Sequence, residues 1–299
     1  MQLWLPALKQ VEPSHPLLEC LHRADRLDHG RAGYLNGFAT FFPGMGEDLP
    51  AAAITREFVA GDAADALWLA ADPAWVRPDM TGARLLACGQ LQLSIDEAHA
   101  LAHALRPLFD ELGMQLLVST ADRWHLQLPA GTVLPHFAAP EQALGEDLTQ
   151  HLPAGAEGRR WRVLLNDIQI TLHQLPLNAQ RHARGLPPVN SLWLWGGGQL
   201  PAKLHSGCNA VISDDLLLRA LAHRAGVLQH TRTPQAVASA TSGCLIDLQD
   251  LPSSEIAANW WPILQTLLAR HPVVLHFASG ERWQHKPWHR WRFWRRAGH

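Results

Sequence analysis

Hydrophobic and polar positions alternate most regularly between residues 66 and 128. Four short apolar runs there predict strands: residues 66–70, 84–93, 116–119 and 124–128. Ser94 and Glu97 form an S-x-x-E capping box, in which each side chain binds a backbone donor at a helix start. The predicted helix continues to about Leu112, and Gly113 ends it. Strands and a helix of this kind in one short segment predict a compact α+β unit.

The segments on either side of this unit are less regular. Residues 14–28 carry leucines at helical spacing, which predicts a helix. Residues 30–50 are rich in Gly, Phe and Pro and are interpreted as an ordered loop, and residues 129–160 are interpreted as a connector.

In residues 161–201, polar and apolar residues are closely interleaved. Residues 161–165 predict a strand, and residues 168–173 predict a short helix that Pro176 stops. Asn178 is expected to cap a second helical turn that ends at Gly185. Residues 191–195 then predict a buried strand that three consecutive glycines interrupt.

The last third of the chain alternates between short apolar runs and helical segments. The runs that predict strands are residues 210–213, 227–229, 244–248 and 273–277. Ser213 is expected to cap a helix over 216–223 that Gly226 closes. Such alternation favours a mostly parallel α/β sheet.

Composition narrows the class of protein. The chain has 299 residues, 47% hydrophobic and 17% charged, which is typical of a well-packed globular protein of one large or two ordinary domains. A net charge of -2 creates no whole-molecule field for nucleic acid or membrane. The four cysteines lack C-x-x-C spacing, and no segment has the roughly 18 apolar residues that a membrane span needs. A cytoplasmic protein without a transmembrane segment is expected.

The stretch from Asn166 to Pro201 is the strongest candidate for a binding site. Its polar residues are interleaved with Ile, Leu and Trp, as in a pocket wall: Asn166, Asp167, Gln169, His173, Asn178, Arg181, Arg184 and Asn190. Gly196, Gly197 and Gly198 could let backbone N–H groups approach an anion, or could form only a tight loop. Neither a dinucleotide-binding nor a P-loop motif occurs.

Other clusters carry weaker signals. His99 and His103 share one helix face but lack a visible third metal ligand, and Asp214 with Asp215 suits a helix start without any catalytic role. From Arg282 onward, cations alternate with Trp residues. Such a tail could bind single-stranded nucleic acid or an anionic membrane, or its Trp rings could pack on the body while the Arg groups stay in water.

Two runs carry a resemblance to known families. L-N-D-I-Q-I-T-L-H-Q-L-P-L-N-A-Q-R followed by P-V-N-S-L-W-L-W-G-G-G-Q-L-P resembles the bacterial RpfE-type regulatory protein family over most of the chain. More distantly, the order of features is similar to that of the archaeal-type cofactor-independent phosphoglycerate mutases. The matching positions are Arg77, residues 94–128, 175–178 with Arg181, 193–198 and 216–226.

The resemblance implies an alkaline-phosphatase-like α/β fold, a mostly parallel sheet core with an inserted α+β subdomain. The core would comprise residues 1–65 and 155–299, and the subdomain with its connector residues 66–154. The resemblance also implies an anion site. The expected ligand-binding residues are Arg77, His173, Asn178, Arg181, Arg184, Asn190, Gly196, Gly197 and Gly198.

Departures from the mutase pattern bear on catalysis. Those enzymes are metal-dependent and carry an N-terminal metal-binding Asp and a nucleophilic Ser, but residues 1–13 lack any D-G-x-G-D-like run. After residues 245–248 only Asp250 could serve as a metal ligand, whereas a two-metal site needs several carboxylates and histidines. We therefore expect no catalytic residue, metal or cofactor, and a regulatory protein that binds a phosphorylated metabolite or a protein partner.

Two alternatives stay open. One is an active metal-dependent phosphoglycerate mutase or phosphatase with a rearranged site. The other is nucleic-acid or membrane-surface binding through the tail, although nucleic acid is not the expected partner. The Trp-rich strand and tail could also form a homodimer interface.

Overall fold

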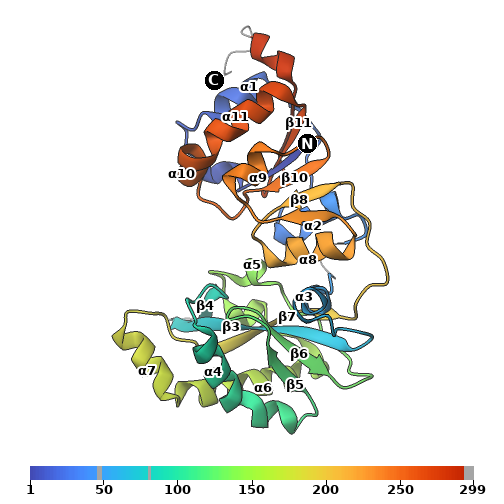
Figure 1. Ribbon diagram of the computed structural model, residues 1–299. Coiled ribbons are helices and arrows are strands. Elements are labelled where there is room, and N and C mark those ends of the chain that lie inside the picture. The colour runs from blue at the N-terminus through green and yellow to red at the C-terminus, as the bar shows by residue number, and fades with distance from the viewer. Residues whose placement is uncertain (46–48, 80–81, 293–299) are drawn as a thin grey trace. The chain divides into compact units, whose positions relative to one another are not determined.

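The computed structural model describes residues 1–45, 49–79 and 82–292 (Figure 1). The chain divides into two compact units. One comprises residues 1–47 and 203–299, called the discontinuous unit here, and the other comprises residues 48–202, called the central unit. The second unit is therefore inserted in the sequence of the first.

The discontinuous unit is built on a mostly parallel seven-stranded sheet. Its strands, in spatial order, are β2 (Asp25–Arg26), β12 (Arg282–His285), β11 (Val273–Phe277), β1 (Gln2–Leu5), β10 (Cys244–Asp247), β8 (Ala210–Ile212) and β9 (Leu228–His230). The five strands from β11 to β9 are parallel, and β12 and β2 add antiparallel pairs at one edge. This arrangement confirms the predicted α/β class.

Helices cover both faces of this sheet because alternate strand residues point to opposite sides. Leu3, Leu5 and Ile246 pack in one core cluster with residues of α1 (Leu17–Arg23), α9 (Pro234–Ala238) and α11 (Trp261–Arg270). Trp4, between Leu3 and Leu5, packs instead against Tyr34, Phe38 and Phe41 of α2 (Tyr34–Phe41). The unit also contains α8 (Leu216–Arg224), α10 (Ser253–Glu255), a π-helical segment (Ile256–Trp260) and the 3-10 turns η1 (Leu8–Gln10) and η4 (Pro287–Trp291).

The central unit is an antiparallel sheet organised around one long strand. β3 (Leu67–Asp79) pairs with β6 (Trp124–Leu128) through its first half and with β4 (Gly82–Cys88) through its second half. β7 (Ser191–Gly198) pairs with β3, and β5 (Gln115–Val118) pairs with β6. β3 therefore contacts three of the other four strands, which makes it the frame for this unit.

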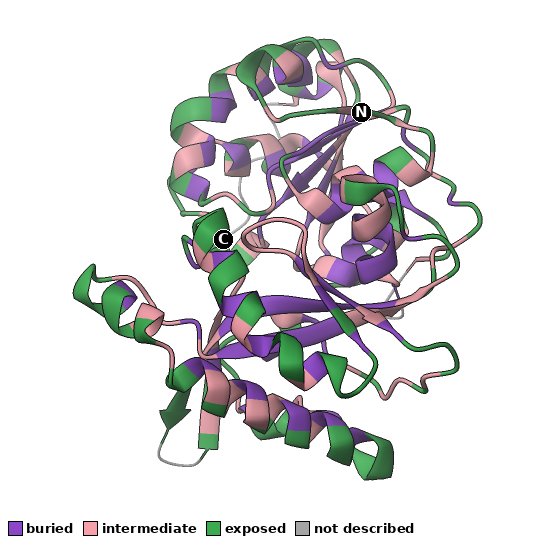
Figure 2. Ribbon diagram, turned by 60° about the horizontal axis from the view of Figure 1, so that its bottom comes forward, coloured by how far each residue is buried: buried purple, intermediate pink, exposed green. Residues whose placement is uncertain are grey.

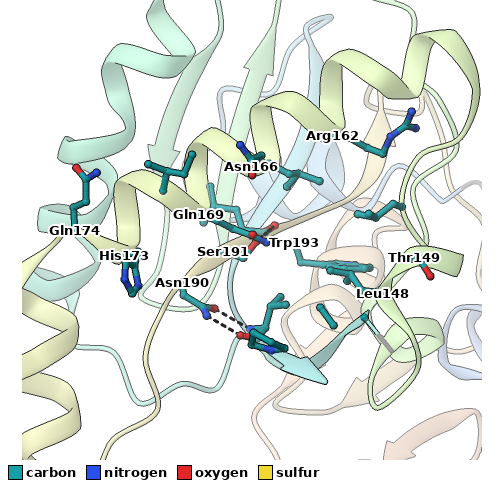
Figure 3. Close-up of a pocket in the computed structure, with 18 residues that line it drawn as sticks. Leu148, Thr149, Arg162, Asn166, Gln169, His173, Gln174, Asn190, Ser191 and Trp193 are labelled. Carbon is teal, nitrogen blue, oxygen red and sulfur yellow. Dashed lines mark hydrogen bonds between the residues drawn. The ribbon is translucent and has the colours of Figure 1, made fainter. Parts of the chain in front are cut away.

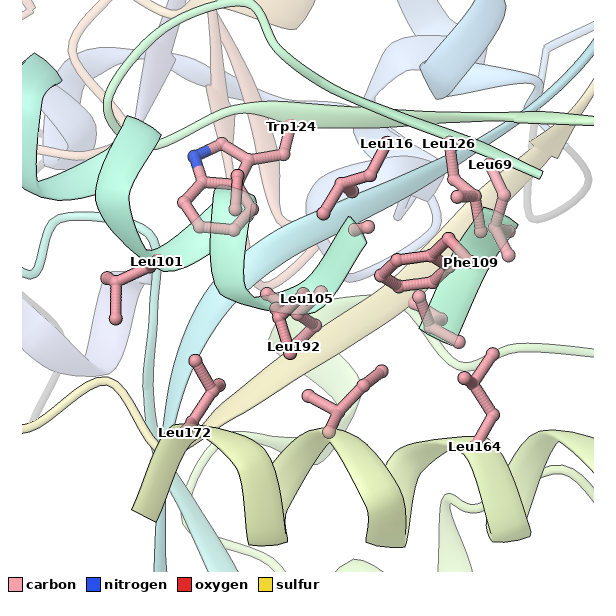
Figure 4. Packing of buried hydrophobic residues seen from close by; sticks show 14 of the residues in the cluster. Leu69, Leu101, Leu105, Phe109, Leu116, Trp124, Leu126, Leu164, Leu172 and Leu192 are labelled. Atoms are coloured by element: carbon pink, nitrogen blue, oxygen red, sulfur yellow. The ribbon is translucent and has the colours of Figure 1, made fainter. Parts of the chain in front are cut away.

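Helices lie on both sides of the β3 sheet (Figure 1). On one side, Leu105 and Phe109 of α4 (Ile95–Asp110) and Ile168 of α6 (Gly155–His173) share a buried core with Leu126 and Leu192 of the strands (Figure 4). On the other side, α3 (Ala51–Ala60) packs against β3 and β7. Shorter elements complete the unit: α5 (Pro140–Ala143), the 3-10 turn η2 (Leu148–Gln150) and α7 (Pro176–Ala183). β3, β6 and β7 are largely buried, and the helices keep exposed outer faces (Figure 2).

Several local predictions are confirmed. Ser94 and Glu97 form both hydrogen bonds of the capping box at the start of α4, and Gly113 adopts a φ of +66° just after its end. The strand pair at 116–119 and 124–128 is the antiparallel β5 and β6. The four C-terminal runs are β8, β9, β10 and β11.

Other local predictions were wrong. Residues 161–165, predicted as a strand, belong to α6, and the loop predicted at 30–50 contains α2. The residue that caps α8 is Asp215, whose carboxylate accepts from the Leu218 N–H, rather than Ser213. Asn178 lies inside α7, where Leu175 is the capping position. Tertiary packing decides each of these because the local signals allow more than one structure.

The limits of the compact units also differ from the expected division. We expected the core to include residues 1–65 and 155–299, but α3, α6 and β7 pack with the β3 sheet in the central unit. The compact units therefore divide at 47/48 and 202/203.

Candidate functional site

α6 is a two-faced helix. Trp161, Leu164, Ile168 and Leu172 recur at helical spacing and are buried in the core of the central unit. Four polar residues recur along a different face at spacings of four, three and four: Arg162, Asn166, Gln169 and His173. Residues at such spacings share one side of a helix, so they form a polar row along α6 (Figure 3).

The polar row lines a cavity of about 630 Å³, called the α6 groove here (Figure 3). Its other walls come from β3, β4, η2 and β7. The lining residues are Val76, Pro78, Gly82, Ala83, Leu148, Thr149, Leu152, Arg162, Leu165, Asn166, Gln169, Ile170, His173, Gln174, Asn190, Ser191, Leu192 and Trp193. The size is that of a ligand pocket, and the mixture of apolar walls with a few polar groups is typical of one.

The ionisable side chains in the described lining of the α6 groove are basic. No aspartate or glutamate belongs to its described lining, whereas Arg162 and His173 lie on it. One terminal nitrogen of Arg162 donates to the carbonyl oxygen of Pro153, which fixes the guanidinium beside the groove. The site therefore suits a neutral or singly negative ligand better than a cation or a highly charged phosphate.

Two of the predicted site residues bind the backbone of residues distant from them in sequence. The Asn190 amide accepts from the Val76 N–H at 2.8 Å and donates to the Val76 carbonyl at 2.7 Å (Figure 3). Asn178 does the same for Val189, accepting at 2.9 Å and donating at 2.9 Å, and also donates to the Leu172 carbonyl. Asn190 also lies on the groove, but Asn178 does not.

Arg181 and Arg184 converge on Glu97 rather than on the groove. Arg181 is fully buried and donates to the Glu97 carboxylate at 2.8 Å and to the carbonyls of Leu91 and Pro187. Arg184 is half exposed and binds the other oxygen of the same carboxylate. Burial alone would raise the pKa of Glu97, but the hydrogen bonds from Arg184 and the Ser94 backbone, with the two positive charges, lower it. The two arginines thus join α7 to the start of α4.

The three glycines allow close packing. A Cβ at Gly196 would lie 2.8 Å from the Ala51 Cβ, and one at Gly198 would lie 2.7 Å from the Pro50 Cβ. A Cβ at Gly197 would lie 2.6 Å from Leu134. All three are the last residues of β7, and their missing side chains make room for the start of α3 and for Leu134.

The structure therefore brings only His173 and Asn190 of the expected ligand-binding residues to the α6 groove. Arg77 is exposed on β3, opposite Arg84 of β4, and is not part of the lining. The sequence interpretation missed Arg162 and Trp193 and did not select Asn166 or Gln169 as ligand-binding residues. The helical spacing of the polar row could have identified Arg162, but residues 161–165 were predicted as a strand.

A second polar cluster lies at the carboxyl ends of β8, β9 and β10 in the discontinuous unit, where open α/β sheets commonly bind ligands. Its carboxylates are engaged by protein groups. Asp247 accepts from the Ser213 hydroxyl at 2.6 Å, Asp215 accepts from the Tyr34 hydroxyl at 2.7 Å, and Arg232 pairs with Asp250. No group of three or more His, Cys, Asp or Glu side chains within 1–45, 49–79 and 82–292 is arranged to hold a metal ion. The donor set in these ranges does not fit a two-metal site.

Asp247 should make the stability of the protein depend on pH. Burial, and then the charge of Asp215, raise its pKa from 3.8 to about 7. The folded state therefore holds this proton more tightly than the unfolded state, and the stabilisation is complete below about pH 4 and is lost as pH rises through 7. Asp247→Asn does not titrate. Its free energy of unfolding, relative to wild type, should increase between pH 4 and 8 by up to about 4 kcal/mol.

Urea unfolding of both proteins across this pH range measures the difference. Asp214→Asn, at a more exposed carboxylate of the same cluster, serves as the control for the removal of one negative charge. A wild-type to Asp247→Asn difference that is constant with pH would contradict the raised pKa.

The described part of the Arg and Trp tail has two exposed indole rings. Lys286 lies 5.2 Å from the ring centroid of Trp288, and Arg290 lies 5.1 Å from that of Trp291. Trp288 and Trp291 are 55% and 59% exposed, so these two residues are not buried in the unit. Residues 293–299 of the predicted tail lie outside the described residues. Within the described ranges, no helix is both long and apolar enough to cross a membrane.

Comparison with known proteins gives a partial similarity. No family model matches the chain. A 93-residue match is 33% identical to the 2,3-bisphosphoglycerate-independent phosphoglycerate mutase of Methanosarcina mazei, covering 29% of this chain and 23% of that protein. A 101-residue match is 36% identical to the probable 2,3-bisphosphoglycerate-independent phosphoglycerate mutase of Geobacter sulfurreducens, covering 32% and 24%. The matches therefore span about a quarter of the relatives' length.

Solved structures give a broader but weaker similarity. The cofactor-independent phosphoglycerate mutase of Thermoplasma acidophilum aligns with a TM-score of 0.40 and 13% identity, over 96% of this chain and 89% of that chain. The PH0037 protein of Pyrococcus horikoshii aligns with a TM-score of 0.47 and 11% identity, over 95% and 85%. Part of this sequence is thus similar to the phosphoglycerate mutases. The RpfE-type resemblance stays a prediction.

Proposed function

We propose that this protein is a non-catalytic, regulatory relative of the cofactor-independent phosphoglycerate mutases that binds its ligand in the α6 groove. The observation that carries the proposal is the polar row of Arg162, Asn166, Gln169 and His173 on a cavity whose other walls are largely apolar. Such a site is suited to bind and orient a molecule.

The second support is the state of the acidic cluster in the discontinuous unit. Its carboxylates bind Ser213, Tyr34 and Arg232, so they hold the ends of the strands together. Phosphoryl transfer by metal ions needs carboxylates that are directed at the metals. We therefore place ligand binding, rather than phosphoryl transfer, first among the functions of this chain.

The charge of the groove restricts the ligand further. A phosphorylated acid carries several negative charges, whereas Arg162 and His173 are the only groove residues that can be cationic in the described lining. An amphipathic ligand with one acidic group, or none, matches this lining better. The expectation of a phosphorylated ligand thus has less support than the binding function itself.

Ligand binding is tested by thermal-shift and calorimetric titration. The probes are 3-phosphoglycerate, amphipathic monocarboxylic acids and short peptides, each with Mn²⁺ and with a chelator. A ligand present at 100 times its Kd should stabilise the native protein by about 2.7 kcal/mol. The stabilisation should survive the chelator and be lost in Gln169→Leu, because that change removes an amide from the centre of the polar row.

Gln180→Leu is the matched control, since Gln180 is an exposed glutamine on α7 outside the groove. It should bind every probe as the wild type does. The proposal fails if no probe binds, or if Gln169→Leu binds them equally well. Phosphoglycerate mutase activity that appears with Mn²⁺ and disappears with chelator would instead favour the enzyme alternative.

A further inference from the structure

The polar row has the length and spacing of a binding strip. Arg162 and His173 are 11 residues apart, which at 1.5 Å per residue is about 16 Å along α6. An extended peptide of about five residues covers the same distance at roughly 3.3 Å per residue. Within the described parts of the chain, the amides of Asn166 and Gln169 make no hydrogen bond to another residue, although both line the groove.

The central unit itself shows what such amides can bind. Asn190 clamps the N–H and the C=O of Val76, and Asn178 clamps those of Val189. In both cases a side-chain amide forms two hydrogen bonds with the backbone N–H and C=O of one residue. Asn166 and Gln169 present the same chemistry to the α6 groove, with no backbone from the described chain to receive it.

The wall opposite the polar row is apolar. Val76 and Pro78 of β3 contribute to it, as do Leu148 and Leu152 around η2. Trp193 adds an indole ring that is held in place because its Nε1 donates to the Ala138 carbonyl at 2.9 Å. Alternate side chains of an extended peptide point to opposite sides. The N–H and C=O groups of an extended peptide point roughly at right angles to its side chains, so a peptide hydrogen-bonded to the polar row would direct every second side chain to the same side of the groove, where apolar side chains can contact the apolar lining.

We propose that the α6 groove binds an extended peptide segment of a partner protein, with apolar side chains at alternate positions and a neutral or acidic net charge. The charge follows from Arg162 and His173 and from the lack of any carboxylate in the described lining. This inference rests on the proposed function only in taking the α6 groove as the ligand site. A small acidic metabolite is the competing occupant.

The test is selection from a phage-displayed library of random 12-residue peptides against the whole protein. Enriched peptides should alternate apolar and polar residues and carry no net positive charge. Synthetic copies should bind wild-type protein and Gln180→Leu equally in fluorescence anisotropy. They should bind Asn166→Leu/Gln169→Leu at least 10-fold more weakly, because that variant has lost both amides of the strip.

Backbone methylation distinguishes main-chain recognition from side-chain recognition. N-methylation at successive positions of the best peptide removes one N–H at a time, and at least one position should weaken binding by 10-fold or more. Circular dichroism melting of the double variant confirms that it is folded, since Asn166 is exposed and Gln169 is half-buried.

The outcomes separate the two proposals. No enriched peptide, or peptides that bind the double variant as tightly as wild type, would overturn the peptide inference. If an amphipathic acid nevertheless stabilises wild type and not Gln169→Leu, ligand binding in the groove stands without the peptide. If neither class of probe depends on Gln169, both proposals fall.

Discussion

Replacing Arg181 by methionine should lower the free energy of unfolding by about 3–5 kcal/mol, because it removes the buried cationic partner of the Glu97 carboxylate and the donor to two interior carbonyls. Arg181 is fully buried and binds Glu97, Leu91 and Pro187. Glu97 is also the capping-box residue of α4. One substitution therefore affects both the attachment of α7 and the start of α4. Urea denaturation at pH 7 measures the effect.

Arg184→Met is the matched control. Arg184 pairs with the same carboxylate, but its side chain is 54% exposed, and an exposed ion pair contributes about 0–1 kcal/mol. The two variants should thus differ by several-fold in their cost. Equal costs would contradict the conclusion that burial makes Arg181 a structural residue. Ligand binding at the α6 groove should persist in Arg184→Met, since that residue does not line it.

Gly196→Ala should destabilise the protein by about 2–5 kcal/mol, of which left-handed backbone contributes about 1–2 and crowding about 1–3. Gly196 has a φ of +60°. A Cβ added there would lie 2.8 Å from the Ala51 Cβ and 3.4 Å from the Ala51 backbone nitrogen. Neither neighbour is the end of a flexible side chain, so α3 would have to move away from β7. Thermal and urea unfolding both measure this loss.

Gly185→Ala separates the two contributions. Gly185 has a φ of +72° after the end of α7, and a Cβ there would meet nothing within 4 Å. It should therefore cost only the backbone contribution, about 1–2 kcal/mol. If Gly196→Ala cost no more than Gly185→Ala, close packing would not be the reason for glycine in β7. An anion-binding loop would then be the better explanation of the glycine run.

The local signals of α4 were sufficient to predict it from sequence. Ser94 and Glu97 satisfy each other's backbone donors at the helix start, and Gly113 takes the left-handed conformation after its end. These interactions join residues three positions apart or depend on the φ of one residue, so residues that are close in sequence determine them. The parallel strands β8, β10 and β11 were predicted for a similar reason, because a short apolar run between turn signals is typical of a buried strand.

α6 shows where local signals were not sufficient. The run Trp161 to Leu165 contains enough apolar residues for a strand, and only the wider spacing of Ile168 and Leu172 indicates a helix with one buried face. The incorrect strand also separated Arg162 from Asn166, Gln169 and His173, which share one face of the same helix. One error in periodicity thus changed the predicted site.

The amino-acid sequence was sufficient to predict an α/β protein with an inserted α+β unit, the capped helix α4, and a stretch in which polar residues alternate with apolar ones. Which of those polar residues face the groove, and which are structural, follows from contacts between distant segments. Arg181, Asn178 and Asn190 are all polar residues of the same stretch, and the sequence does not show which partner each one binds. Their partners are Glu97, Val189 and Val76, as many as 114 positions away. Composition and spacing report the chemistry that a residue offers, whereas its partner is fixed by packing between distant segments.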